Sequence, residues 1–177
     1  MYVRRSLFLS ILVILAIAAV PAAAAKKSGK QVFLGQFGSW YAYKLKEKGS
    51  PVCYIVSKPV RSRGKYKKRG DVVAFVTHRP KDGERDVVNF QAGYTYKDGA
   101  EVTAVIDKKK SFELTTERDA AWSRNAPADK VLVEAMIKGR TLILTGRSKS
   151  GVKTTDIYSL NGFTNARKRI NRACKAR

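Results

Sequence analysis

Residues 140–174 read RTLILTGRSKSGVKTTDIYSLNGFTNARKRINRAC, and this stretch decides the fold. In its first part Leu142 and Leu144 alternate with Thr and Ile, which is the period of a half-buried β-strand. Glycines and serines then supply a turn, and a second strand is predicted over residues 152–160. After Gly162 the apolar period becomes that of a helix, on a stripe formed by Phe163, Ala166, Ile170 and Ala173. The stretch therefore predicts a β-hairpin followed by a C-terminal helix that ends at a cysteine.

The residues before this stretch indicate short strands and one internal helix. Residues 71–77 are apolar at both odd and even positions, which favours a central strand. The helix is predicted over residues 128–138, after Pro127 and before Gly139. The other predicted strands lie within residues 32–46, 52–57, 88–94, 102–106 and 112–114. Short strands separated by turn signals predict an all-β fold, a β-sandwich or a barrel, with two short helices.

The first 25 residues have the pattern of a secretory signal peptide. Two arginines precede an apolar run over residues 7–20, and small residues follow at the positions of a cleavage site. We therefore predict cleavage after Ala25 and a single domain over residues 26–177. The mature protein is then periplasmic, on the outer surface or secreted, with no permanent membrane span. The alternative is an uncleaved anchor, because residues 6–25 are long enough to cross a bilayer.

The chain is strongly basic, with 36 Lys and Arg against 14 Asp and Glu and a net charge of +22. Cleavage after Ala25 removes two arginines and no acid, which leaves +20. A charge of this size exceeds what solubility requires and predicts an anionic partner. For an exported protein the candidate partners are lipopolysaccharide, acidic lipid and glycosaminoglycan, and nucleic acid is less favoured.

Cys53 and Cys174 are the two cysteines of the chain. In an oxidising compartment two thiols most often pair, so we predict a disulfide that ties a strand to the C-terminal helix. A metal site would need more Cys and His side chains nearby, and the chain has one histidine. No metal or other cofactor is therefore predicted.

Several short motifs give the chain a family resemblance. They include Thr77-His78-Arg79-Pro80, Phe112-Glu113-Leu114, Leu132-Val133-x-Ala135-Met136-x-Lys138-Gly139, Thr154-Thr155-Asp156-x-Tyr158-Ser159-Leu160 and Ala173-Cys174. Together they resemble the invasion-associated locus B family of bacterial exported proteins, over nearly the whole mature chain. The resemblance implies an immunoglobulin-like β-sandwich, a periplasmic or outer-surface location and a loose link to host-cell invasion. It brings no catalytic residues with it.

Four features suggest sharper functions, and each has a simpler structural explanation. His78 precedes Arg79-Pro80 at a strand end, where a capping or surface role is expected. Residues 146–151 superficially resemble the Gly-x-Ser-x-Gly of hydrolases, but their spacing is wrong and a hairpin turn explains them. Asp156 falls on the inward face of its strand, where we expect it to accept hydrogen bonds or to meet an arginine. Arg69-Gly70-Asp71 matches a tripeptide that adhesion receptors bind, but so short a motif recurs by chance.

The main functional signal is a run of cations before the strand that begins at Asp71. Residues 58–69 hold seven Lys and Arg and no acid. Like charges repel one another, and Arg binds phosphate and sulfate in bidentate fashion, so the run favours an anionic ligand. A solvated, mobile loop is the alternative. With the cations of the C-terminal helix, the predicted polyanion-binding residues are Arg61, Arg63, Lys65, Lys67, Lys68, Arg69, Arg167, Lys168, Arg169 and Arg172.

These observations predict a non-enzymatic exported protein that binds anionic envelope or host-surface polymers. The alternative is a structural envelope protein that its charge holds to the membrane surface. An enzyme is not favoured, because no set of catalytic side chains converges in the sequence. The cations from Arg61 to Arg69 lack apolar periodicity, so we expect them to contribute little to the stability of the fold.

Overall fold

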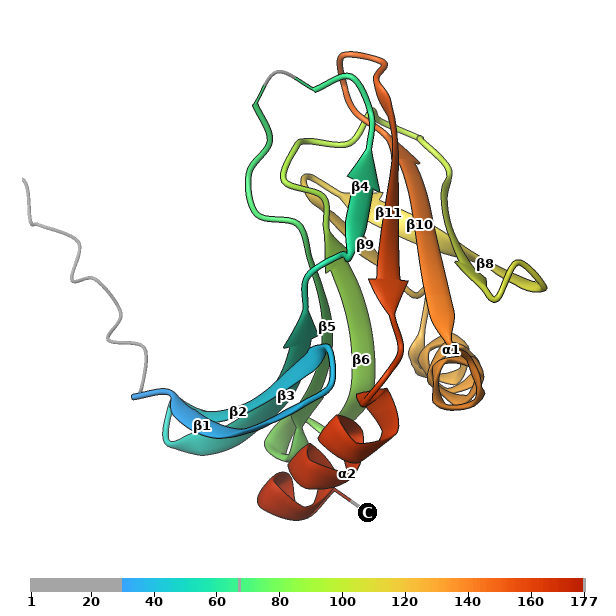
Figure 1. The fold of residues 1–177 in the computed structure, drawn as a ribbon. Helices are drawn as coiled ribbons and strands as arrows, with labels where there is room; N and C mark the ends of the chain where they lie inside the picture. The colour runs from blue at the N-terminus through green and yellow to red at the C-terminus, as the bar shows by residue number, and fades with distance from the viewer. Residues whose placement is uncertain (1–29, 67, 177) are drawn as a thin grey trace, which may run out of the picture.

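The computed structural model describes residues 30–66 and 68–176. The predicted signal peptide and Lys67, one of the predicted contact residues, lie outside the described residues. The strands are β1 (Val32–Phe37), β2 (Trp40–Glu47), β3 (Ser50–Ser57), β4 (Arg61–Arg63), β5 (Val73–Arg79), β6 (Glu84–Gln91), β7 (Val102–Ile106), β8 (Lys110–Glu117), β9 (Ala120–Trp122), β10 (Thr141–Arg147) and β11 (Lys153–Ser159). The helices are the short 3-10 helix η1 (Pro80–Asp82), α1 (Ala126–Lys138) and α2 (Phe163–Cys174) (Figure 1).

The strands of the described residues pair antiparallel in one continuous sheet, in the order β1-β2-β3-β5-β6-β9-β8-β7-β10-β11-β4. The sheet turns over around β9 and β8, so that β10 and β11 lie across from β6 (Figure 1). The rings of Phe90 on β6 and Tyr158 on β11 meet across the interior, with centroids 6.1 Å apart. The predicted β-sandwich with one internal and one C-terminal helix is confirmed. It is compatible with the immunoglobulin-like sandwich that the resemblance implies.

The core is filled from alternate positions of the strands. Trp40, Ile55, Val76 and Phe90 are fully buried, and each lies on a different strand. Burying a large apolar side chain contributes about 1.5–3 kcal/mol relative to leaving it exposed. β5 lies between β3 and β6, as the sequence predicts for a central strand.

Helix α1 begins two residues earlier than predicted because its N-cap was not recognised. The side chain of Asn125 accepts a hydrogen bond from the backbone nitrogen of Ala128 at 3.0 Å, which is the usual way to satisfy a free amide at a helix start. The helix ends at Lys138, before Gly139, as predicted. Its buried stripe, which includes Leu132 and Met136, is consistent with its contacts to β6.

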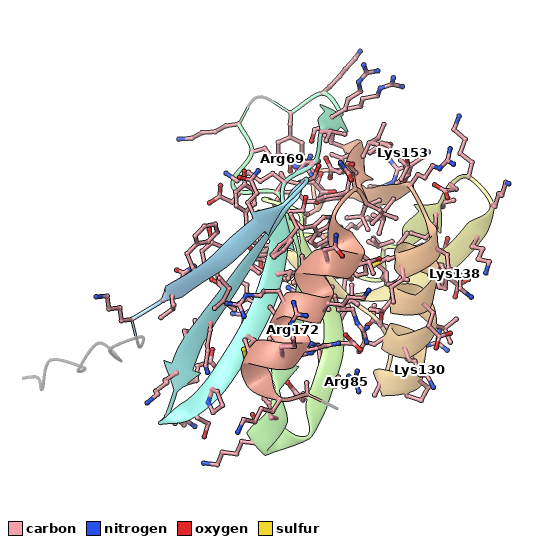
Figure 2. The ribbon with its side chains drawn as sticks, turned by 60° about the horizontal axis from the view of Figure 1, so that its bottom comes forward. Arg69, Arg85, Lys130, Lys138, Lys153 and Arg172 are labelled. Carbon is pink, nitrogen blue, oxygen red and sulfur yellow. A yellow bond between two sulfur atoms is a disulfide. The ribbon has the colours of Figure 1, made fainter. Side chains whose placement is uncertain are left out.

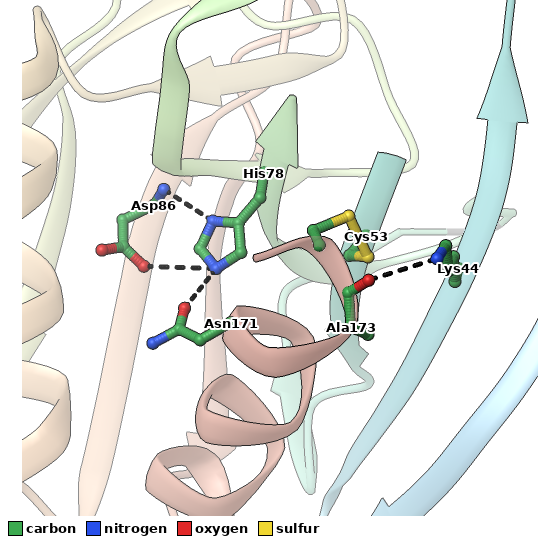
Figure 3. The surroundings of a disulfide bond; sticks show 7 residues. Lys44, Cys53, His78, Asp86, Asn171 and Ala173 are labelled. Atoms are coloured by element: carbon green, nitrogen blue, oxygen red, sulfur yellow. Dashed lines mark hydrogen bonds and ion pairs between the residues drawn. A yellow bond between two sulfur atoms is a disulfide. The ribbon is translucent and has the colours of Figure 1, made fainter. Parts of the chain in front are cut away.

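Helix α2 packs against the half of the sheet that contains β2 and β3. Phe163 at its start meets Trp40, with ring centroids 5.0 Å apart, and its last residue forms the Cys53–Cys174 disulfide (Figure 3). The predicted disulfide is therefore confirmed. Gly162 begins the helix with a φ of +88°, and a Cβ there would overlap the carbonyl of Phe37. The turn before α2 thus requires glycine.

Candidate anion-binding surface

Part of the predicted cationic loop is an edge strand. Arg61–Arg63 forms β4, which pairs with β11 through residues 155–157, and the amide of Val60 extends the pairing to the carbonyl of Ile157 at 2.7 Å. Both arginines are exposed. A short, charged edge strand resists pairing with other chains, which gives these cations a structural use in addition to any ligand. The alternative of a loop is therefore wrong for residues 61–63, which form a strand and are exposed to solvent.

The segment after β4 is held against the sandwich by aromatic and backbone contacts. The ring of Tyr66 stacks on that of Tyr94, with centroids 5.2 Å apart and planes 15° apart. The amide of Gly70 donates to the carbonyl of Gly93 at 2.9 Å. Lys65 and Lys68, which lie on either side of Tyr66, stay exposed. The segment is therefore anchored at Tyr66 and Gly70 while its lysines face solvent.

Arg69, unlike the exposed Arg61 and Arg63, directs its charge into the molecule. Its guanidinium donates two hydrogen bonds to the carboxylate of Asp156, at 2.8 and 2.6 Å, and its Nε donates to the carbonyl of Ala92 at 2.6 Å. The charge also lies over the ring of Tyr94, 4.9 Å from the centroid. The side chains of Arg69 and Asp156 are 13% and 2% exposed. This corrects the prediction that Arg69 binds a polyanion and contributes little to stability.

The burial of this ion pair also bears on the orientation of Asp156 and on the Arg69-Gly70-Asp71 tripeptide. Asp156 points inward and meets an arginine, as predicted. Burial alone would lower the pKa of Arg69, but the hydrogen bonds and charge of Asp156 outweigh burial, and the pKa is raised above its ordinary value. In Arg69-Gly70-Asp71 the guanidinium of Arg69 is used inside the molecule, so the tripeptide is not presented whole at the surface in this conformation.

The turn between β10 and β11 adds cations that sequence reasoning missed. The amide of Lys97 donates to the carbonyl of Arg147 at 3.1 Å, and that of Lys149 donates to the carbonyl of Thr95 at 2.9 Å. β4 and the β10–β11 turn lie at the same end of the sandwich (Figure 1). We call the exposed cations of this end the cationic tip: Arg61, Arg63, Lys65, Lys68, Lys97, Arg147, Lys149 and Lys153.

The cationic tip has few internal counter-charges. Within residues 30–66 and 68–176, none of its eight side chains lies within 4.0 Å of a carboxylate. An open cleft of about 440 Å³ beside the β10–β11 turn is lined by Lys97, Arg147 and Lys153. Asp98 and Glu101 also line it, so the cleft itself is only weakly positive. Residues 61–68 contain no acid, so Arg61, Arg63, Lys65 and Lys68 form the more strongly basic part of the tip.

The cations of α2 form a separate and weaker patch. Figure 2 places Arg172, on α2, away from Arg69 and Lys153 at the tip end. Arg167 donates to the buried carboxylate of Asp86 at 2.7 and 2.5 Å, and Arg169 is half-buried and donates to the carbonyl of Leu34. Lys168 and Arg172 are exposed. The predicted role of Arg167 in polyanion binding is therefore corrected, since its charge is neutralised inside the molecule.

His78 is buried, contrary to the predicted capping or surface role. Its Nδ1 accepts from the amide of Asp86 at 3.0 Å, which leaves Nε2 to donate to the side-chain oxygen of Asn171 at 2.6 Å (Figure 3). Burial lowers the pKa of His78, although the nearby carboxylate of Asp86 opposes this effect. His78 thus joins β5, β6 and α2 as a neutral side chain beside the disulfide.

The sequence could have indicated the β10–β11 cations but not their neighbours. Arg147, Lys149 and Lys153 lie in and beside a turn that the sequence predicts. Their proximity to β4 depends on the pairing of β11 with β4, two strands separated by about ninety residues. No local pattern encodes such a pairing.

The described residues contain no cluster of three or more His, Cys, Asp or Glu side chains suited to a metal ion, and none of their helices is long and apolar enough to cross a membrane.

A solved structure and a family model both resemble this chain. The crystal structure of invasion associated protein B from Bartonella henselae is similar, with a TM-score of 0.59 and 18% sequence identity. The match covers 81% of this chain and 97% of that chain. No curated protein is detectably similar to the chain in sequence. The model of the invasion associated locus B family matches residues 40–171, and the chain therefore belongs to that family.

Proposed function

We propose that the protein is an exported, non-enzymatic binding protein that docks on anionic polymers through its cationic tip. The observation that carries the proposal is the set of eight exposed cations at one end, none of them ion-paired within the described residues. Clustered like charges raise the local concentration of an anionic ligand and release its counter-ions on binding. Arg61 and Arg63 add planar donors that fit phosphate and sulfate groups.

Arg69 supports this function indirectly. Its ion pair with Asp156 and the stacking of Tyr66 fix the backbone on both sides of Lys68. A ligand that binds the tip therefore does not have to order the whole segment, and less conformational entropy is lost on binding. The terminal helix offers fewer free cations, because Arg167 is neutralised by Asp86.

The ligand class follows from the proposed location. The pattern of residues 1–25 supports export, and exported proteins meet lipopolysaccharide, acidic lipid and host glycosaminoglycan more often than nucleic acid. Membership in the invasion associated locus B family supports a role in host-cell invasion or colonisation. Mass spectrometry of the envelope-extracted protein should find Lys26 as its first residue. Retention of residues 1–25 would favour the anchored form.

A structural envelope protein held to the membrane surface by its charge is the alternative. Such a protein would bind each anionic polymer in proportion to its charge density, whereas a docking protein selects among them. The experiment is a panel of heparin, lipopolysaccharide and anionic lipid vesicles at two salt concentrations. Selectivity among the three at equal salt supports docking. Equal binding to all three supports the structural alternative.

The site is tested with matched charge removals. The tip variant R61Q/R63Q/K65Q and the control variant K130Q/K168Q/R172Q each remove three exposed cations. The tip variant should bind more weakly and flatten the slope of log affinity against log salt, by about 0.9 for each phosphate of a duplex-like polyanion that is no longer neutralised. The control should change the affinity little. Equal losses of affinity in both variants would mean that net charge, and no localised surface, binds the polymer.

A further inference from the structure

One half of the sheet carries apolar side chains on the face that points away from the core. Inward side chains of this half pack into the interior, and the positions between them point outward. Six outward rings from β1, β2, β3, β5 and β9 define what we call the aromatic face: Phe33, Tyr41, Tyr43, Tyr54, Phe75 and Trp122. This face is on the other side of the sheet from α2.

Four of the six rings form a row across β1, β2, β3 and β5. The register pairs Phe33 with Tyr43 and Tyr43 with Tyr54, and in both pairs the ring centroids are 5.4 Å apart. Phe75 follows, with its centroid 5.9 Å from that of Tyr54. From Phe75 the register continues through the polar Asn89 on β6 to Trp122. The aromatic face therefore extends from the edge strand β1 to β9.

No described element of the chain packs on the aromatic face. Both helices and the other half of the sheet pack on the inward positions, as the contacts of Phe163 with Trp40 illustrate. Phe33 is 56% exposed and Tyr41 is 38% exposed, and the other four rings are half-buried. An antiparallel sheet with one covered face usually carries polar side chains on the other. A contiguous exposed apolar patch is a mark of an interaction site.

The aromatic face also lacks the positive charge of the rest of the molecule. Its outward positions on β2, β3 and β5 are alternate residues of each strand. They are residues 41, 43 and 45, residues 52, 54 and 56, and residues 73, 75 and 77, and none of them holds a charged side chain. At its rim Arg79 is ion-paired with Glu47 at 3.3 Å and Glu84 at 3.2 Å. A neutral apolar face does not attract an anionic polymer, so the ligand of the cationic tip does not explain it.

We propose that the aromatic face binds the same face of a second copy of this chain in a two-fold symmetric dimer. Two flat apolar sheets stack about 10 Å apart, as the two layers of a β-sandwich do, and two-fold symmetry lets one surface serve both partners. The net charge of +22 opposes contact between copies over most of the surface. Among the described residues, the aromatic face is a surface where copies can approach without bringing unpaired cations together.

The size of the face predicts a reversible dimer. Six strands about 4.8 Å apart, each a few residues long at about 3.4 Å per residue, give a flat footprint on the order of 500 Å². Stable interfaces bury about 800 Å² on each partner, and smaller ones belong to weak or transient complexes. High salt should strengthen the dimer, because it screens the repulsion between the two positive chains and leaves apolar contact intact. Polyanion binding should respond to salt in the opposite sense.

The test is sedimentation velocity of the purified protein, expressed as the full chain, over a concentration series at low and high salt. The variant Y54E places a charge at the centre of the face, and V131E places the same charge on an exposed apolar residue of α1. Each lowers the net charge by one. We expect a dimer that tightens with salt, a dissociation constant raised at least about tenfold by Y54E, and no loss of association in V131E.

Several outcomes would overturn the proposal. A wild-type protein that stays monomeric at every concentration and salt level excludes the dimer, and binding of such a monomer to neutral lipid vesicles would assign the face to lipid. Equal dissociation by Y54E and V131E, or a dimer that Y54E leaves intact, places the contact elsewhere. If Y54E fails to give a folded circular dichroism spectrum, Y41E provides the same test at a more exposed ring. None of these results depends on polyanion binding.

Discussion

Replacing Arg69 should destabilise the protein far more than replacing the nearby Arg61. The substitution R69M leaves the Asp156 carboxylate without the two hydrogen bonds that Arg69 donates, in a site where its side chain is 2% exposed. Removing one partner of a buried ion pair costs about 3–5 kcal/mol. That is a large fraction of the about 5–15 kcal/mol by which domains are stable. R61Q changes an exposed side chain and should stay within about 0.5 kcal/mol of the wild type.

The assay is urea unfolding followed by circular dichroism, together with thermal melting. For a domain of this size each kcal/mol shifts Tm by about 2–4 °C, so R69M should lower Tm by about 6–20 °C. The double variant R69M/D156L removes both charges and fills the site with apolar atoms. It should recover at least about 2 kcal/mol relative to R69M, because the buried charge is gone.

Two results would contradict this reasoning. If R69M unfolds within about 1 kcal/mol of the wild type, Arg69 is not a structural residue and becomes a candidate ligand contact again. If R69M/D156L is no more stable than R69M, the destabilisation comes from the missing contacts of Arg69 with Ala92 and Tyr94 and not from the unpaired carboxylate.

Two further predictions concern the junction of α2 with the sheet. Burial lowers the pKa of His78 from 6.5, so the unfolded chain takes up this proton at a higher pH than the folded chain does. The free energy of unfolding should therefore fall as the pH drops below about 6.5, by up to about 1.4 kcal/mol per pH unit, until the pH reaches the folded pKa. Urea titrations of H78Q should lose this dependence, since the chain has no other histidine; an unchanged slope would assign it to carboxylates. The disulfide closes a loop with a sequence separation of 121, and C53S/C174S should unfold with a free energy lower by up to about 4–5 kcal/mol. A thermal melt that matches the wild type would show that α2 docks without it.

Local patterns in the sequence predicted most of the strands and both α-helices, but not β4 or β9. The alternation of Leu142 and Leu144 and the change of period after Gly162 identify β10 and α2, because side-chain periodicity is a property of each element by itself. The start of α1 was missed by two residues, since the capping role of Asn125 depends on one hydrogen bond. The left-handed backbone at Asp86 gave no signal in the period of the side chains.

The candidate site was harder to predict because the use of a charge depends on what lies across from it. Arg61 and Arg69 are indistinguishable in the run of cations, yet one is exposed on an edge strand and the other is buried against Asp156. Likewise Arg167 is neutralised by Asp86, 81 residues earlier in the chain. Partners this distant in sequence are fixed by the pairing of strands and the docking of α2. Composition therefore predicted a cationic protein, and only the fold separates its structural cations from its free ones.

The two proposed surfaces are linked by the charge that they share. Each copy brings a net charge of +20 or more to a dimer, so repulsion between copies weakens association through the aromatic face. A polyanion bound at the cationic tip neutralises part of that charge and reduces the repulsion. By thermodynamic reciprocity, whatever factor the polyanion contributes to dimerisation, dimerisation contributes to polyanion binding. A dimer also presents two tips to one polymer, which strengthens binding further if the polymer can span both. Weak self-association is thus sufficient to make binding to a long polymer stronger than binding to a short one.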